Sequence, residues 1–198
     1  DSICKNGKTL QALNLNDSFV YESTNPYHYT LFRLDNTVSK GNIQTIIKSC
    51  QELKEVNLNY LNANGDKFPG LSDVGLDLLA KNITPNIEKL HLAEHDLRDD
   101  QVKIMLSRCN KIKTLSLNAY WLTDDSLTYI RDYLNLTLEE LSLDDIDDDD
   151  GINFAAYFKL KSMSRLKTLK LYHKGDNCVD FQKLRQHLPH MKIQGFPG

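Results

Sequence analysis

A leucine pattern recurs along the chain and constrains its fold more than any other feature. Its form is L-x-x-L-x-L, with Ile or Val in place of some leucines. The clearest copy is Ile112-Lys-Thr-Leu115-Ser-Leu117, in which apolar and polar side chains alternate as in a strand with one buried face. Copies begin at Leu10, Leu53, Ile87, Ile112, Leu138 and Leu166. The pattern therefore predicts six short strands of one kind.

A second pattern follows several of the strands and predicts a short helix. In Leu122-Thr-Asp124-Asp-Ser-Leu127-Thr-Tyr-Ile130, apolar residues three positions apart mark one helix face, and Thr-Asp stands at the N-cap position. Similar stretches occupy 38–46, 71–79 and 97–105. We expect cap oxygens and negative charge, which the helix dipole favours, from Ser72, Asp73, Asp99 and Asp124. We interpret these aspartates as structural rather than catalytic.

The spacing between the copies predicts the architecture. The last three spacings are 25, 26 and 28 residues, within the range of about 20–29 for leucine-rich repeats. The first two, 43 and 34 residues, require insertions near 17–35 and 60–70. We predict an α/β leucine-rich-repeat solenoid of about six strand-loop-helix repeats in one domain over 1–198, with a parallel concave sheet and helices on the convex side. Because the chain begins at Asp1 inside a repeat-like pattern, we interpret it as a fragment or processed form.

Cysteines at a fixed place in the repeat carry a family resemblance. From Cys109 to Ile130 the chain reads C-x-x-I-x-x-L-x-L-x-x-x-x-L-T-D-x-x-L-x-x-I, and 50–79 follows this pattern more loosely. The pattern resembles the cysteine-containing leucine-rich repeats of F-box/LRR substrate receptors of ubiquitin ligases. The stretch 166–193 is similar to the end of such receptors, where a last helix leads to a final short strand. The third and fifth repeats lack the cysteine, and the sequence contains no F-box motif.

The resemblance implies a substrate-binding domain without chemistry of its own. An F-box outside this sequence would dock the ligase adaptor, and the repeats would present a target protein for ubiquitin transfer. The alternative is a stand-alone leucine-rich-repeat scaffold or secreted effector that binds other proteins without an F-box.

Outward-facing strand positions are the predicted partner surface. Their side chains are mostly small and hydrogen-bonding, with charges of both signs, which suits protein recognition better than binding of a uniformly anionic ligand. On the rim, Tyr120 and the single tryptophan, Trp121, follow the fourth strand. For Trp121, packing against a neighbouring loop is the competing interpretation. The predicted set is Glu55, Asn57, Asn59, Lys89, His91, Ser116, Asn118, Tyr120, Trp121, Ser142, Asp144, Lys170 and Tyr172.

The two insertions add further candidates. The first, 17–35, contains six aromatic-type side chains and fits either a docking loop or a cover over the open N-terminal end of the stack. The second, 60–70, contains Asn-Gly-Asp and Phe-Pro-Gly turn signals, which predict a projecting loop.

We find no catalytic, cofactor-binding or metal-binding motif. The acidic run 144–151 lacks the spacing of an EF-hand calcium loop. We interpret it as a solvated acidic loop that attracts a basic partner segment. An enzyme subunit that uses this loop for a metal ion is the rival interpretation from another class.

Charge and cysteine usage bear on partners and compartment. A formal net charge of −3 gives no basic field for nucleic acid or an acidic membrane surface. No apolar run approaches the roughly 18 residues that would span a bilayer. Widely spaced cysteines at 4, 50, 109 and 178 predict buried thiols in a reducing compartment, cytoplasmic or nuclear. Sequons at Asn16, Asn82 and Asn135 leave a secreted protein as an open alternative.

Overall fold

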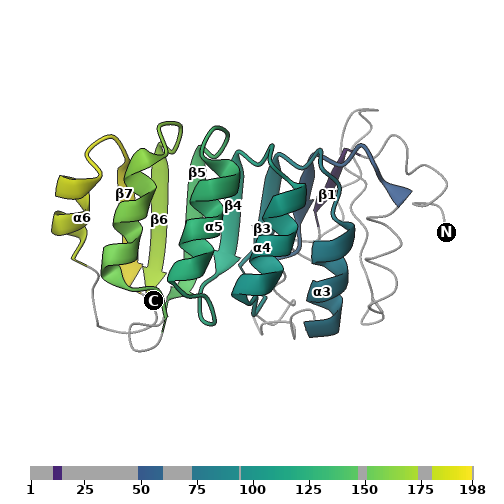
Figure 1. The fold of residues 1–198 in the computed structure, drawn as a ribbon, viewed down its shortest axis with the longest axis horizontal. Helices are drawn as coiled ribbons and strands as arrows, with labels where there is room; N and C mark the ends of the chain where they lie inside the picture. The colour runs from purple at the N-terminus through teal and green to yellow at the C-terminus, as the bar shows by residue number, and fades with distance from the viewer. Residues whose placement is uncertain are drawn as a thin grey trace.

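In the part of the chain that the structure describes, seven parallel strands form one sheet, and every strand pairs with its neighbours in chain order (Figure 1). The computed structural model describes residues 11–14, 49–59, 73–93, 95–146, 151–173 and 180–197. The strands are β1 (Ala12–Asn14), β2 (Glu55–Asn57), β3 (Lys89–Leu92), β4 (Thr114–Asn118), β5 (Glu140–Ile146), β6 (Thr168–His173) and β7 (Lys192–Pro197). The insertions at 17–35 and 60–70 and the predicted helix at 38–46 lie outside the described residues.

Helices cover one face of this sheet, and each helix contacts the next along the stack (Figure 1). They are α3 (Asp73–Asn82), α4 (Asp99–Arg108), α5 (Asp124–Leu134) and α6 (Phe181–His187). Between α5 and α6, a 3₁₀ helix, η1 (Phe154–Ser162), takes the helical position. This is the fifth repeat, whose sequence lacks the Leu-Thr-Asp step. The predicted α/β leucine-rich-repeat solenoid is confirmed.

Leucines of successive repeats stack in register and make one continuous core. Leu115 of β4 pairs with Leu90 of β3 and Leu141 of β5, and all three are fully buried. The same register continues one repeat further, to Leu169 of β6. Because each strand buries only one row of side chains, a single repeat could not stabilise itself, and the stack supplies the missing partners.

The last strand replaces a leucine with a glycine. Gly195 of β7 pairs with Leu171 of β6, so it occupies a core position of the repeat. A Cβ atom at Gly195 would lie 1.9 Å from Cζ of Phe181. The ring of Phe181 from α6 therefore occupies the space that the leucine side chain fills in earlier repeats, and the close approach requires glycine.

The helix-start aspartates carry negative charge as predicted, but their oxygens do not cap their own helices. Asp99 and Asp124 are the first helical residues, and the N-caps are Arg98 and Thr123. One carboxylate oxygen of Asp99 accepts the backbone N–H of Thr123 at 3.1 Å, and the other accepts its hydroxyl at 2.6 Å. Asp124 accepts the backbone N–H of Asn153 at 2.7 Å. Each of these carboxylates therefore binds the N-cap residue of the following helix.

The repeat cysteines are buried as predicted. Cys50 and Cys109 are fully buried thiols, and Cys109 Sγ donates to the carbonyl oxygen of Thr84 at 3.0 Å. Burial raises the pKa of the Cys109 thiol to about 12. The hydrogen bond ties the end of one helical segment to the loop before the preceding strand, so the cysteine acts as a packing residue.

Candidate functional site

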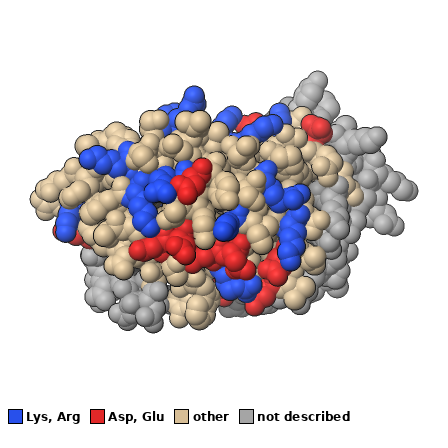
Figure 2. Space-filling view, in the orientation of Figure 1, with Lys and Arg blue, Asp and Glu red and all other residues tan. Residues whose placement is uncertain are grey.

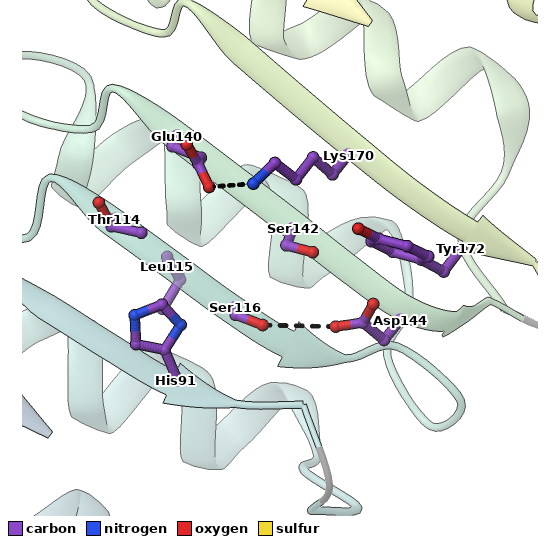
Figure 3. A pocket seen from close by; sticks show the side chains of 9 residues that line it. All are labelled: His91, Thr114, Leu115, Ser116, Glu140, Ser142, Asp144, Lys170 and Tyr172. Carbon is purple, nitrogen blue, oxygen red and sulfur yellow. Dashed lines mark hydrogen bonds and ion pairs between the residues drawn. The ribbon is translucent and has the colours of Figure 1, made fainter. Parts of the chain in front are cut away.

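A hollow of about 200 Å³ lies over β3 to β6 on the strand face, which is the face of the sheet opposite the helices. Side chains from adjacent strands surround it, with the helices behind the sheet (Figure 3). It is lined by His91, Thr114, Leu115, Ser116, Glu140, Ser142, Asp144, Lys170 and Tyr172. The structure thus brings together six residues of the predicted partner set: His91, Ser116, Ser142, Asp144, Lys170 and Tyr172.

One ion pair crosses the hollow. Lys170 Nζ lies 2.6 Å from a carboxylate oxygen of Glu140 on the neighbouring strand. This hydrogen bond raises the pKa of the Lys170 ammonium above its ordinary value. The pair neutralises itself, and both side chains remain about one-third exposed, at 30% and 36%.

Small polar side chains form the floor of the hollow. Ser116 and Ser142 lie side by side in the β4–β5 register and are only 7% and 8% exposed, because larger neighbours shield them. The hydroxyl of Ser116 donates to Asp144 Oδ2 at 3.3 Å. The Ser116 hydroxyl therefore helps to orient the Asp144 carboxylate.

A second ion pair lies beside the hollow on the N-terminal side. Lys89 Nζ is 3.2 Å from a carboxylate oxygen of Glu55, across β2 and β3. His91, two residues along β3, is half-buried, and burial lowers the pKa of its imidazole below the ordinary value. At neutral pH this part of the face carries a self-neutralised ion pair and an uncharged imidazole.

A bulge in β5 places two consecutive carboxylates at the edge of the hollow. The β5–β6 register shifts between Leu143 and Ile146, both of which are buried. Asp145, between them, has a φ of 53°, in the left-handed region that Asp tolerates better than most residues. Its Oδ2 accepts a hydrogen bond of 3.0 Å from Asn118 Nδ2. Asp144 and Asp145 are therefore both partly exposed instead of alternating between surface and core.

The three asparagines of the predicted set bind backbone groups at the ends of their strands. Asn57 Oδ1 accepts the N–H of Asn59, and Asn59 Oδ1 accepts the N–H of Ala93, at 3.0 and 2.9 Å. Asn118 is 5% exposed, and its Oδ1 accepts the N–H of Tyr120 at 2.9 Å. These side chains shape the turns that leave the sheet.

Tyr120 and Trp121 project from the turn between β4 and α5. They are 36% and 59% exposed, and their rings meet edge to face with centroids 4.9 Å apart. The Trp121 side chain is thus mostly exposed, which favours a rim role over the competing interpretation of packing against a neighbouring loop. The turn is fixed to β5, because Ala119 N–H donates to the carbonyl oxygen of Asp144 at 2.6 Å.

Three polar residues of this region were outside the predicted set. Thr114 and Glu140 stand at outward strand positions and line the hollow. Asp145 was missed because strict alternation assigns it to the core face. The signal that could have found it is the run Leu143-Asp-Asp-Ile146, in which the next apolar residue comes one position late and so indicates a bulge.

On the helix side, acidic residues lie at the starts of the helices and basic residues at their ends. Figure 2 shows acidic side chains gathered in a band across the lower part of this view. First-turn acids of the helices are Asp73, Asp99, Asp100, Asp124 and Asp125. Basic residues stand in the last turns of the same helices. The helix dipoles account for this arrangement, so it indicates no ligand.

Among the described residues, no group of three or more His, Cys, Asp or Glu side chains could hold a metal ion. The acidic stretch 147–150 lies outside them. No helix in the described part of the chain is both long enough and apolar enough to cross a membrane.

Sheet order, leucine register and helix placement define a protein of the leucine-rich-repeat solenoid class. Among solved structures, the chain is similar to the leucine-rich repeat-containing protein LegL7 from Legionella pneumophila. The two share 14% identical residues at a TM-score of 0.43, over 79% of this chain and 52% of LegL7. The chain therefore spans about half the length of that protein. No protein-family model matches the sequence, and no curated protein matches it either.

Proposed function

We propose that this chain is a protein-recognition module that binds a partner protein on its strand face and on the Tyr120–Trp121 rim. The observation that carries the proposal is the exposed aromatic pair beside a polar hollow. Aromatic side chains bury large areas at little entropic cost and are enriched among residues that dominate binding energy. Six predicted partner residues line the hollow, and its ion pair can reorganise around a polar ligand group.

The proposed role is recognition rather than catalysis. In the described residues, the strand face presents hydroxyls, asparagine amides at its rim and the ion pairs Lys170–Glu140 and Lys89–Glu55. The mechanism is recognition by shape, hydrogen bonding and aromatic contact.

Affinity capture with matched variants tests the proposal. A strand-face variant carries alanine at Lys89, His91, Tyr120 and Trp121. A control variant carries alanine at four exposed helix-side residues, Lys103, Asp132, Gln182 and Gln186. The strand-face variant should lose partners that wild type and the control both retain, with an unchanged melting temperature. Equal partner lists for all three proteins would contradict the proposed surface.

The finer proposal is that the partner is a ubiquitin-ligase substrate and that the intact protein carries an F-box. Its support is the cysteine-containing repeat pattern, in which Cys109 is a buried packing residue. Coexpression of the full-length gene product with the ligase adaptor tests it. A stable complex is expected. Absence of a complex, with partner capture intact, would favour the stand-alone scaffold or secreted effector.

A further inference from the structure

We infer that the chain has a second interaction surface, at the C-terminal end of the stack, which binds a short acidic segment of a partner protein. Four exposed basic side chains before and at the starts of β6 and β7 form this surface, which we call the basic edge: Lys161, Arg165, Lys167 and Lys192. The Tyr120–Trp121 rim follows the end of a strand, so the two surfaces lie at opposite edges of the sheet. The inference therefore goes beyond the proposed function and does not depend on it.

Charge is distributed unevenly along the chain. Residues 151–198 contain nine Lys and Arg and two Asp, a formal net charge of +7. Residues 1–150 contain 15 Lys and Arg and 25 Asp and Glu, a formal net charge of −10. One of the two aspartates, Asp180, caps α6 by accepting the backbone N–H of Lys183 at 2.8 Å. Positive charge gathered in one part of an acidic chain indicates an anionic partner for that part.

The basic edge begins where an alternating row of charges ends. The residues directly before β2 to β6 alternate in sign along the sheet: Lys54, Glu88, Lys113, Glu139 and Lys167. Lys113 and Lys167 each lie 2.6 Å from the glutamate of the preceding repeat. The next position in the row, directly before β7, is the buried Met191 instead of an acid. Among the described residues, the row therefore has no carboxylate beyond Lys167.

Backbone hydrogen bonds hold the two turns of the basic edge side by side. The N–H of Lys192 donates to the carbonyl oxygen of Lys167 at 2.7 Å. Each turn is closed by a main-chain hydrogen bond of its own, at 3.1 Å within 163–166 and at 3.0 Å within 188–191. Both turns lie at the upper end of the view in Figure 1, where the strands begin. The basic side chains therefore project from one ordered frame.

Several cations share one carboxylate at this edge. Glu139 pairs with Lys167 at 2.6 Å, and this hydrogen bond, with weaker attraction from Arg165 and Lys113, lowers the pKa of the Glu139 carboxyl below its ordinary value. The helix dipole does not account for the basic edge, because Arg165, Lys167 and Lys192 come after η1 and α6 have ended. The edge thus holds more cations than carboxylates and can bind further carboxylates from a partner.

The rest of the molecule favours a short acidic peptide over an extended polyanion. A nucleic acid backbone or an anionic bilayer covers a wide surface, and the excess negative charge of residues 1–150 would repel it. His187 stacks on Phe158 at 4.2 Å between ring centroids, and Lys183 Nζ lies 5.4 Å from the ring centroid of Phe154. These contacts reduce the ring surface available for base stacking. A short peptide can contact the basic edge alone.

Titration with short probes tests the inference. Two of them are acetylated, amidated peptides, Gly-Glu-Glu-Glu-Glu-Gly and its glutamine counterpart Gly-Gln-Gln-Gln-Gln-Gly. The others are a thymidine oligonucleotide and phosphatidylcholine–phosphatidylserine vesicles. Amide shifts of residues 163–168 and 188–193 in NMR spectra report binding. The glutamate peptide should give a saturable shift that weakens as salt increases, and the glutamine peptide should give none. Neither the oligonucleotide nor the vesicles should displace the glutamate peptide at the same concentration of negative charge.

Matched variants localise the binding. Arg165→Gln together with Lys192→Gln removes two positive charges but leaves the ion pair described for this edge intact. The control, Lys81→Gln together with Lys103→Gln, makes the same net-charge change on α3 and α4. All four side chains are exposed, so both variants should keep the melting temperature of wild type. The first variant should bind the glutamate peptide about tenfold more weakly, a difference of about 1.4 kcal/mol, and the control should bind it as wild type does.

Three results would overturn the inference. They are no saturable shift with the glutamate peptide up to about 10 mM, equal weakening by the control variant, or displacement of the peptide by the oligonucleotide or the vesicles. The strand-face variant used for affinity capture should bind the glutamate peptide as wild type does. If it does so while capture gives equal partner lists, the proposed function fails and this inference stands. If capture depends on the strand face but the glutamate peptide does not bind, only this inference fails.

Discussion

Asp99 binds the N-cap residue of the next repeat's helix: its carboxylate accepts both the backbone N–H and the hydroxyl of Thr123, at 3.1 and 2.6 Å. It also accepts the hydroxyl of Ser126 in the first turn of that helix. In a solenoid each repeat contacts only its neighbours, so hydrogen bonds of this kind couple adjacent helices. Asp124 forms the corresponding contact one repeat further along, with Asn153.

Removing these hydrogen bonds should destabilise the protein. Asp99→Ala should lower the free energy of unfolding by about 1–2 kcal/mol, because it removes the acceptor of the Thr123 and Ser126 hydrogen bonds at the start of α5. Asp100→Ala is the matched control. It removes the same charge from the same helix start but breaks only an exposed contact with Arg98 at 3.4 Å, so it should cost less than about 1 kcal/mol. Urea unfolding of both variants measures the difference, and equal losses would refute the cross-repeat role.

His95 predicts a pH dependence of stability. It is fully buried, its Nε2–H donates to the carbonyl oxygen of Leu58 at 3.1 Å, and burial lowers the pKa of the imidazole to about 4. The unfolded state has the ordinary pKa of about 6.5, so it binds a proton in the range where the folded state does not. The contribution of His95 to the free energy of unfolding should be complete above pH 6.5. It should fall by about 3 kcal/mol as the pH drops to 4.

The variant His95→Gln isolates this contribution. Glutamine keeps an N–H donor for Leu58 but does not titrate. Between pH 6.5 and 4, the free energy of unfolding from urea titrations should fall less steeply for the variant than for wild type. Parallel slopes for the two proteins would show that another group is responsible.

The contact between Gly195 and Phe181 predicts a compensating pair of substitutions. Gly195→Ala should destabilise the protein by about 1–3 kcal/mol, because the new methyl group overlaps the ring. Phe181→Ala should also destabilise it, through lost packing. The double variant should be more stable than the sum of the two losses predicts, which a double-mutant cycle measures. Additive losses would mean that the ring moves away freely.

Cys109 should be unreactive in the folded protein. Its pKa of about 12 and complete burial keep it as a thiol that reagents cannot reach. Alkylation with iodoacetamide at pH 8, followed by site-resolved mass spectrometry, should modify Cys50 and Cys109 only after unfolding in urea. Rapid modification of either residue in the native state would contradict the packing described for the repeat.

The sequence predicted the solenoid because the same leucine pattern recurs in every repeat. Leu90, Leu115 and Leu141 repeat the same position, so an error in one copy would not change the fold. The strand face followed from alternation, since a residue between two buried leucines must point away from the core. These predictions needed only local spacing and apolar character.

The remaining features depend on contacts between repeats, which local spacing does not reveal. The pattern identified Asp99 as a helix-start residue but could not show that its oxygens bind the next repeat. Alternation assigned Asp145 to the core, whereas a bulge places it beside Asn118. Local spacing also gives no sign that the ring of Phe181 fills the leucine position at Gly195. Packing against a loop was the competing interpretation for Trp121, yet the residue is 59% exposed.

Hydrogen–deuterium exchange on the complex with a captured partner tests the central claim most directly. The account predicts that partner binding slows amide exchange in the turn 118–121 and at the end of β5, residues 142–146, and leaves the outer surfaces of α4 and α5 unchanged. Protection confined to those helices, with the strand face exchanging as in the unbound protein, would contradict recognition through the strand face and its rim.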